Sequence, residues 1–281
     1  MPKTPQADQP ATAPGLPPVV LALSGLDPTG SAGLLADVRV LGALGCHPCG
    51  IVTCQTVQTS RGLAGIRPSD PEFLREQLKA VTEDLSLSAV KIGALASVRT
   101  IEVIGAALSK IPEVPVVLDP VFAPTKGPRF LDMDGMRAMS RELLGRTLIA
   151  TPNIAELGAP AGLDVDQSDD EMIHGCAAGW FAAGARALLV TGLRREGAMV
   201  DRLIRPDSEG KIAVTDIPHA YHDVGDVHGS GCILAAALAA YIARGEELVE
   251  AARLASQFAS RLIERSRRFG LGAAFWIDAR G

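Results

Sequence analysis

Short apolar runs alternate along the chain with longer stretches in which apolar residues recur every three or four positions. A short apolar run between polar or glycine-rich residues predicts a strand that is buried on both faces. Spacing of three and four predicts a helix. The predicted strands lie at residues 19–23, 49–59, 87–93, 114–121, 146–152 and 185–192, and the predicted helices at 33–44, 71–83, 98–109, 169–184, 231–244 and 247–267.

This alternation predicts βαβ units built around a mainly parallel sheet with helices on both faces. One segment departs from it. Residues 198–217, "AMVDRLIRPDSEGKIAVTDI", alternate polar and apolar positions on both sides of Asp207 to Gly210, which predicts a β-hairpin. Because no repeat, linker or shift in composition follows residue 18, the sequence predicts one α/β domain over residues 19–281.

The first 18 residues, "MPKTPQADQPATAPGLPP", contain six prolines and no apolar core. This composition predicts a disordered leader and does not match a signal peptide. No apolar run reaches the roughly 18 residues of a membrane-spanning helix.

The charge and the cysteine count exclude further classes of protein. A net charge of −5 with 21% charged residues gives no basic footprint for nucleic acid and no polybasic membrane tether. Five cysteines, an odd number in a chain of 281 residues, do not indicate a disulfide framework. We therefore expect a cytoplasmic protein with reduced thiols, whose partners are small molecules.

Polar or glycine-rich clusters directly follow most of the predicted strands. Ligands of open α/β sheets bind outside the carboxyl ends of the strands, so these clusters predict a site along one edge of the sheet. The clusters lie at residues 25–33, 55–59, 91–94, 119–121, 151–156 and 191–194.

The segment "HGSGC", His228 to Cys232, precedes the alanine-rich helix near the C-terminus. Gly229 and Gly231 allow a tight turn that points successive N–H groups at one spot, and the positive end of the helix dipole adds to them. Such a turn suits a phosphate or a phosphoryl group in transfer. The same field is expected to lower the pKa of the Cys232 thiol, which could then act as a base.

A structural interpretation of "HGSGC" is equally open from the residues alone. Gly-Ser-Gly could serve only close helix packing, with Cys232 as a small buried apolar side chain. The same holds for "CHPCGIVTC" at residues 46–54, where a Cys-x-x-Cys lacks a second pair of ligands and favours apolar packing over a metal site. The sequence has no Gly-x-x-x-x-Gly-Lys-Ser/Thr segment, which excludes a Walker-type ATPase.

Four segments taken in order carry a family resemblance: "LALSGLDPTGSAGLLADV", "LDPV", "TPNIAEL" and "HGSGC". In this combination the chain resembles the hydroxymethylpyrimidine and phosphomethylpyrimidine kinases of thiamine biosynthesis, from about residue 19 to about residue 267. The resemblance implies the ribokinase-like three-layer α/β/α fold. It also implies phosphorylation of a pyrimidine alcohol and then of its monophosphate, with ATP and Mg²⁺, by a homodimer for which the hairpin at 198–217 offers a contact.

The resemblance also implies roles for individual residues. Gly229, Gly231 and Cys232 form an anion hole in which Cys232 is the base, at a position where most ribokinase relatives have aspartate. The substrate-side residues are Gly25, Asp27, Asp37, Thr56, Gln58, Ala94 and Val121, with Gln58 on the pyrimidine ring and Asp37 near the substrate hydroxyl. The nucleotide side comprises Asp119, Asn153, Glu156, Thr191 and Arg194, with Mg²⁺ held by Asp119 and Glu156 through water.

Several positions depart from the family pattern. Thr191 stands where the family has a lysine that contacts ATP phosphate, and Arg194 is the candidate replacement for that charge. Ala94 replaces a methionine over the pyrimidine, and Thr56 replaces an apolar residue near the ring. These changes keep two alternatives open: a pyridoxal or pyridoxine kinase, and a non-catalytic relative that binds the pyrimidine. Without the resemblance, Asn153 and Asp119 would be interpreted as cap or turn residues.

Overall fold

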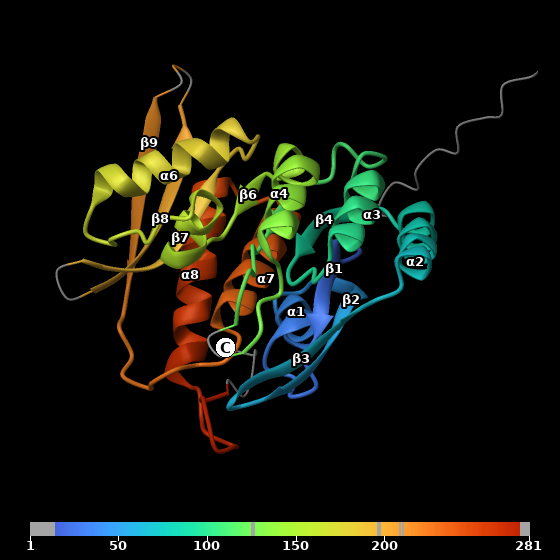
Figure 1. Ribbon diagram of the computed structural model, residues 1–281, viewed down its shortest axis with the longest axis horizontal. Helices are drawn as coiled ribbons and strands as arrows, with labels where there is room; N and C mark the ends of the chain where they lie inside the picture. Colours follow the sequence, from blue (N-terminus) through green and yellow to red (C-terminus); the bar gives the residue numbers. More distant parts are fainter. Residues whose placement is uncertain (1–14, 125–126, 196–197, 208, 210, 276–281) are drawn as a thin grey trace, which may run out of the picture.

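A computed structural model describes residues 15–124, 127–195, 198–207, 209 and 211–275 (Figure 1). Most of the predicted leader, residues 1–14, and part of the predicted hairpin turn lie outside these ranges. In the described part of the chain, no helix is both long enough and apolar enough to span a bilayer.

In the described ranges, nine strands form one sheet in the order β3-β2-β1-β4-β5-β6-β7-β8-β9. The six strands from β2 to β7 in this order pair in parallel, whereas β3, β8 and β9 pair antiparallel at the two edges. The predicted hairpin is confirmed as β8 and β9. The strands are β1 Val19–Leu26, β2 His47–Thr59, β3 Gly62–Pro68, β4 Leu87–Ile92, β5 Val116–Leu118, β6 Ile149–Ala150, β7 Leu188–Arg195, β8 Ala198–Pro206 and β9 Ile212–His219.

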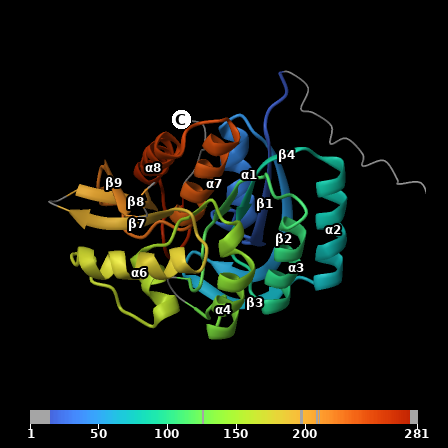
Figure 2. The same ribbon diagram turned by 90° about the horizontal axis from the view of Figure 1, so that it is seen from above.

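Helices cover both faces of the sheet, as predicted, with α1, α7 and α8 on one face and α2, α3, α4 and α6 on the other (Figure 2). Most of them begin at a side-chain cap; Asp70, Ser97, Asp132 and Asp169 each accept a hydrogen bond from the first turn. The helices are α1 Gly33–Ala43, α2 Pro71–Asp84, α3 Val98–Leu108, α4 Met133–Glu142, α5 Ile154–Gly158, α6 Asp170–Ala182, α7 Ser230–Ala243 and α8 Leu248–Glu264, with short 3₁₀ turns at Leu144–Arg146 and Ala159–Ala161.

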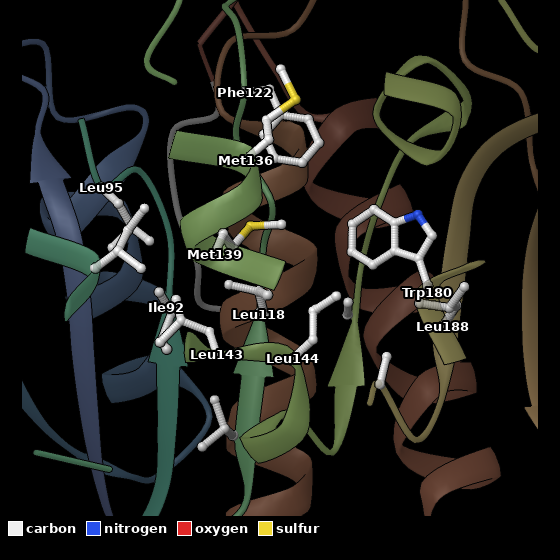
Figure 3. Close-up of a cluster of buried hydrophobic side chains, with 14 of the residues drawn as sticks. Ile92, Leu95, Leu118, Phe122, Met136, Met139, Leu143, Leu144, Trp180 and Leu188 are labelled. Carbon is white, nitrogen blue, oxygen red and sulfur yellow. The ribbon is translucent and has the colours of Figure 1, made fainter. Parts of the chain in front are cut away.

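Strand β1 shows how the sequence divides the core between the two faces. Side chains alternate across a strand, so Leu21 and Leu23 join the cluster beneath α2, α3, α4 and α6, while Val20 and Ala22 join the cluster with α1, α7 and α8. All four residues are at most 1% exposed. Figure 3 shows part of the first cluster, in which the ring centroids of Phe122 and Trp180 lie 6.5 Å apart.

Helix α7 is apolar all round because it lies in the middle of its layer. It contacts α1, α8 and strands β1, β4 and β5. Five of its alanines, Ala235 to Ala237 with Ala239 and Ala240, are buried, and their small side chains allow close approach on every side. The first residues of this helix are those of the predicted anion turn, so the turn is anchored to the densest part of the core.

Three predictions of local structure were incomplete. Strand β3 was missed; it pairs with the outer half of β2, which ends at Thr59 as predicted and begins two residues earlier than predicted, at His47. Helix α4 was missed. The last helix ends at Glu264, three residues earlier than predicted, because Arg267 instead pairs with Phe275 in an isolated bridge.

Candidate active site

The predicted edge of the sheet holds a pocket of about 660 Å³. It is lined from every side by the clusters that follow the parallel strands, together with the start of α7 and the last described residues of the chain. The residues predicted for the site that line this pocket are Gly25, Asp27, Thr56, Gln58, Ala94, Asp119, Val121, Asn153, Glu156, Thr191, Gly229, Gly231 and Cys232. The structure thus brings these residues together in one pocket; Asp37 and Arg194 lie elsewhere.

The turn before α7 requires glycine at one position only. Gly229 has φ of +83° and is the N-cap of α7. A Cβ on Gly229 would overlap the carbonyl oxygen of Ser31, so this turn packs directly on the loop before α1. Gly231, by contrast, is exposed and faces open space. No side chain caps α7 within the described residues, which leaves the first N–H groups of the helix for a ligand.

Helix α1 begins beside the same turn. Its N-cap, Ala32, has no side-chain cap either, and Ala32 and Gly33 line the pocket. The Gly33 N–H hydrogen-bonds the sulfur of Cys232. Two helix N-termini therefore meet at the thiol, which gives this corner the character of an anion site.

The predicted lowering of the Cys232 pKa is wrong for this pocket without ligands. Burial raises the pKa of the thiol to about 12; Lys91 and the Gly33 N–H oppose the rise, and the carboxylates of Asp119 and Asp37 add to it. The prediction considered only the helix field and did not include the two carboxylates that the fold places nearby. Cys232 is accordingly a neutral thiol at neutral pH.

Beneath the floor of the pocket lies a buried ion pair that sequence reasoning missed. The Lys91 ammonium donates to both carboxylate oxygens of Asp37, at 2.9 Å each, and both side chains are 0% exposed. Ser24 donates to Asp37 at 2.5 Å and accepts from Lys91 at 3.2 Å. Burial lowers the pKa of Lys91, but Asp37, Cys232 and Asp119 together more than offset this, so the ammonium persists.

This pair corrects the expected position of Asp37. Its carboxylate is occupied by Lys91 and Ser24 and does not line the pocket, so it cannot touch a substrate hydroxyl there. The sequence contains one residue that the ion pair requires, Gly93, two positions after Lys91. A Cβ on Gly93 would lie 2.9 Å from the Lys91 ammonium and 2.8 Å from the Ser24 oxygen. The glycine of "KIG" therefore leaves room for the buried ammonium.

Asp119 and Glu156 face each other as a pair of carboxylates with raised pKa values. Burial raises the pKa of Asp119 to about 6, against the opposing effect of Lys91 at 3.9 Å. Burial and the Asp119 charge raise the pKa of Glu156 to about 8. Within the described structure, Asp119 Oδ2 is buried and has no hydrogen-bond partner.

These features fit a divalent cation. An unpartnered buried carboxylate oxygen beside a second carboxylate is what hard cations such as Mg²⁺ neutralise. In the described ranges no three acidic, histidine or cysteine side chains gather as a metal site. Two carboxylates leave most coordination positions to water and phosphate oxygens, as in nucleotide-dependent Mg²⁺ sites.

Asn153 and Glu156 also have the structural role that the residues alone suggested. Asn153 is the N-cap of α5, and the two residues form a capping box: Glu156 N–H donates to Asn153 Oδ1 and Asn153 N–H donates to Glu156 Oε2, both at 2.9 Å. Thr191 N–H donates to the Pro152 carbonyl and holds β7 beside this cap. The cap fixes Glu156 against the pocket.

On the substrate side, His228 links two predicted residues. Its Nε2 lies 2.8 Å from Asp27 Oδ2 and 2.9 Å from the Gln58 amide nitrogen. Asp27 also accepts from the N–H groups of Thr29 and Ala32. Burial raises the pKa of Asp27, but the hydrogen bonds from His228 and Thr29 bring the pKa below its ordinary value. A fixed Asp27 carboxylate thus orients His228, whose Nε2 either donates to Asp27 when protonated or accepts from the Gln58 amide when not.

The remaining substrate-side residues form the pocket wall. Gly25 is tightly enclosed: a Cβ there would lie 2.9 Å from Cys54 Sγ and 3.5 Å from the Ala94 Cβ. Thr56 donates its hydroxyl proton to the Leu26 carbonyl at 3.0 Å, which explains a polar residue at this position. Cys46 and Cys54 are buried, as expected from apolar packing.

A second structure that sequence reasoning missed closes the pocket at its mouth. We call residues 54–68, the paired part of β2 and β3, the flap, and residues 267–275 the strap. Ala273 N–H and Gly272 N–H donate to the backbone and side-chain oxygens of Ser60 at the flap tip, at 2.8 and 3.1 Å. The strap and the flap tip lie side by side (Figure 1).

The strap also binds the segment before the anion turn. Ala274 N–H donates to the Asp226 carbonyl and His228 N–H donates to the Ala274 carbonyl, both at 2.9 Å. The Phe275 ring lies 5.9 Å from the His228 ring. The strap therefore joins the flap to the anion turn. Local sequence patterns do not predict contacts between residues so far apart in the chain.

Arg194 does not replace the missing lysine charge at Thr191. Its guanidinium lies 4.7 Å over the Tyr221 ring, and its backbone N–H donates to Gln167. Thr191 lines the pocket, whereas the Arg194 side chain does not. The left-handed Gly192, φ +76°, turns the chain between the two.

The comparison with known families agrees with this geometry. The phosphomethylpyrimidine kinase family matches residues 27–275. The chain belongs to this family. It is 32% identical to the hydroxymethylpyrimidine/phosphomethylpyrimidine kinase of Streptomyces coelicolor, with 93% of this chain and 94% of that protein covered. The resemblance inferred from the four short segments is thereby confirmed.

Solved structures confirm the ribokinase-like fold expected for the family. The chain is similar to Bacillus subtilis pyridoxal kinase in its ADP complex, with a TM-score of 0.83, 24% identity, and coverage of 94% and 98% of the two chains. It is also similar to phosphomethylpyrimidine kinase from Clostridium difficile 630, with a TM-score of 0.70, 26% identity, and coverage of 85% and 96%.

Proposed function

We propose that the protein transfers the γ-phosphoryl group of ATP to the hydroxymethyl oxygen of 4-amino-5-hydroxymethyl-2-methylpyrimidine, and then phosphorylates the resulting monophosphate. One observation carries this proposal: the uncapped start of α7, with Cys232 in its first turn, shares a pocket with the Asp119–Glu156 carboxylate pair. Family membership supports the same reaction. The predicted homodimer and cytoplasmic location stay predictions.

The nucleotide side of the site supports Mg²⁺-ATP. Asp119 and Glu156 would hold Mg²⁺, directly or through water. A bound Mg²⁺ would supply neutralising charge to the nucleotide phosphates. The N–H groups at the start of α7 would bind the transferring phosphoryl group, since its charge is spread over its three equatorial oxygens.

In the transfer step, the substrate oxygen forms a bond to the γ-phosphorus while the bond from that phosphorus to the ADP oxygen breaks. The hydroxyl proton leaves toward Cys232 Sγ, which acts as base once the thiol has ionised. Lys91 and the N–H groups of α1 and α7 favour the thiolate. The raised pKa of the thiol makes ionisation the step that limits this base at neutral pH.

The ring of the substrate would be held by the Asp27–His228–Gln58 arrangement, because Gln58 lines the pocket and its amide nitrogen lies against His228, leaving the amide oxygen for the ring. Pyridoxal is the second candidate substrate. It carries the same hydroxymethyl arm, and Ala94 leaves space where a methionine would otherwise cover the ring.

The test is an ATP-coupled assay that offers the pyrimidine, its monophosphate and pyridoxal in parallel, with Cys232→Ala as the control. We expect turnover of the pyrimidine and its monophosphate, reduced at least about 100-fold in the variant, in line with the loss of a general base. Turnover of pyridoxal alone would instead assign the protein to vitamin B6 phosphorylation. Binding of the pyrimidine without any turnover would establish a non-catalytic binder.

A further inference from the structure

The pocket has an unusual balance of charge for a site that binds phosphates. Four acidic side chains line it: Asp27, Asp119, Glu156 and Asp226, of which Glu156, with a pKa of about 8, becomes a charged carboxylate only when a cation neutralises it or the pH rises. A nucleotide adds several more negative charges, and one divalent cation cannot offset all of them. Like charges in a partly enclosed pocket repel strongly, so further cations are required for tight binding.

Among the described residues, two side chains with a permanent positive charge line the pocket, and both are arginines, Arg61 and Arg268. Lys91 lies below the floor and is neutralised by Asp37. Arg61 and Arg268 are exposed, and neither guanidinium makes an ion pair or a hydrogen bond with any described residue.

The two arginines come from the two segments that meet at the pocket mouth. Arg61 follows Ser60 at the tip of the flap, and Arg268 is at the start of the strap. The strap binds Ser60 through Gly272 and Ala273, which brings the two segments together. Arg268 lies beside the segment that leads into the anion turn: a Cβ on Gly225 would lie 3.4 Å from Arg268 Nη2.

We propose that Arg61 and Arg268 bind phosphate groups in the pocket and supply the positive charge that Thr191 does not. The inference rests on the proposed function for the identity of the ligands, which are the nucleotide phosphates or the phosphate of the pyrimidine monophosphate. A guanidinium presents a planar set of donors that matches phosphate oxygens two at a time. Two such groups on either side of the flap–strap contact would close over a phosphate bound at the start of α7.

The experiment measures binding by calorimetry for wild type, Arg61→Ala, Arg268→Ala and the control Arg265→Ala. Arg265 is exposed, lies at the end of α8 and does not line the pocket, so the control removes the same charge outside the site. The probes are ADP against adenosine, and the pyrimidine monophosphate against the pyrimidine alcohol. Only the phosphate differs within each pair.

We expect Arg268→Ala and Arg61→Ala each to weaken binding of at least one phosphorylated probe by about 10-fold or more, as for loss of a hydrogen bond to a charged group. Adenosine and the alcohol should bind as to wild type. A loss on ADP assigns the arginines to the nucleotide, and a loss on the monophosphate assigns them to the substrate. Unchanged binding of both phosphorylated probes, or equal losses in Arg265→Ala, would overturn the proposal.

A second variant tests whether Arg268 replaces the missing lysine. Thr191→Lys in the Arg268→Ala background should restore ADP affinity toward wild type; an affinity no better than that of Arg268→Ala alone rejects the replacement. None of these measurements requires turnover. If the wild type fails to phosphorylate the pyrimidine but ADP binding still depends on Arg268, the proposed substrate is wrong. The proposal that Arg268 binds phosphate groups is then still supported.

Discussion

The thiol of Cys232 experiences opposing electrostatic effects from its neighbours. The N–H groups of two helix starts and the Lys91 ammonium favour the thiolate, while burial and the carboxylates of Asp119 and Asp37 favour the neutral thiol. In the pocket without ligands, the effects that favour the neutral thiol are the larger, and the pKa of Cys232 is about 12. A base that must first lose its own proton is present in its active form only in a small fraction of molecules, and that fraction rises with pH.

This leads to a prediction for the pH dependence of catalysis. Below the pKa of Cys232, each pH unit raises the thiolate fraction about 10-fold, so log kcat/KM should rise with pH with a slope near one from about pH 6.5 to 9. Cys232→Asp replaces the thiol with an acid that ionises several units lower, and its profile should lose this rise. Steady-state kinetics over that range measure both.

The comparison between the two profiles isolates the thiol, because Asp119 and Glu156 titrate in both proteins. Two parallel profiles would contradict the assignment of the base to Cys232.

At the residue scale, the sequence allowed prediction of the residues whose role depends on backbone position. Gly229, Cys232, Asp119 and Glu156 follow strands or begin helices, and the ends of such elements meet at one edge. Partnerships across the fold were not predictable. Lys91 and Asp37 are separated by 54 residues, and only the packing of α1 on β1, the strand that pairs with β4, makes them a buried ion pair.

At the element scale, the flap and the strap lie far apart in the sequence but are joined by specific hydrogen bonds. Gly272 allows this contact, because a Cβ there would overlap the backbone of Ser60 and Arg61. The strap has no strand or helix pattern of its own, so neither its course nor its contact with the flap could be predicted. Helix α4 and strand β3 were missed for a related reason: both are short, and glycines and polar residues interrupt their apolar pattern.

We predict that Gly272→Ala separates the strap from the flap tip. Both hydrogen bonds to Ser60 would be lost, and the KM for the pyrimidine should rise about 10-fold, equivalent to the loss of one to two ordinary hydrogen bonds. The kcat should change less, because the anion turn is anchored by α7. Phe269→Ala, which removes a side chain that is 67% exposed in the same segment, is the matched control. Equal KM values for wild type and Gly272→Ala would show that the contact does not order the substrate side.

At the scale of the whole molecule, the site opposes stability. Glu156 has a pKa of about 8 in the folded protein, against an ordinary value of 4.5. Between these two pH values the folded state binds a proton that the unfolded state does not. The free energy of unfolding therefore falls as pH rises through this window, and the decrease is complete once pH exceeds the folded-state pKa. Asp119, with a pKa of about 6, adds a decrease of the same sign at lower pH.

The corresponding prediction concerns thermal unfolding without nucleotide or Mg²⁺. The Tm of the wild type should fall between about pH 6 and pH 8.5, and Glu156→Gln should show a flatter curve. Glutamine can still complete the capping box, so the variant removes the titrating group while keeping the cap. Differential scanning calorimetry over this range provides the measurement; the same slope in both proteins would mean that Glu156 does not titrate in this window.

Helix α7 determines how the loss of activity on heating should relate to unfolding of the protein. The amides that would hold the phosphoryl group are the first turn of a helix whose next residues are buried on every side. Surface loops can unfold locally and inactivate an enzyme at temperatures at which the rest of the fold is intact. This turn cannot unfold without disrupting the packing of α7 at the centre of its layer. Heat inactivation and global unfolding should therefore coincide, and activity itself should report the integrity of the core.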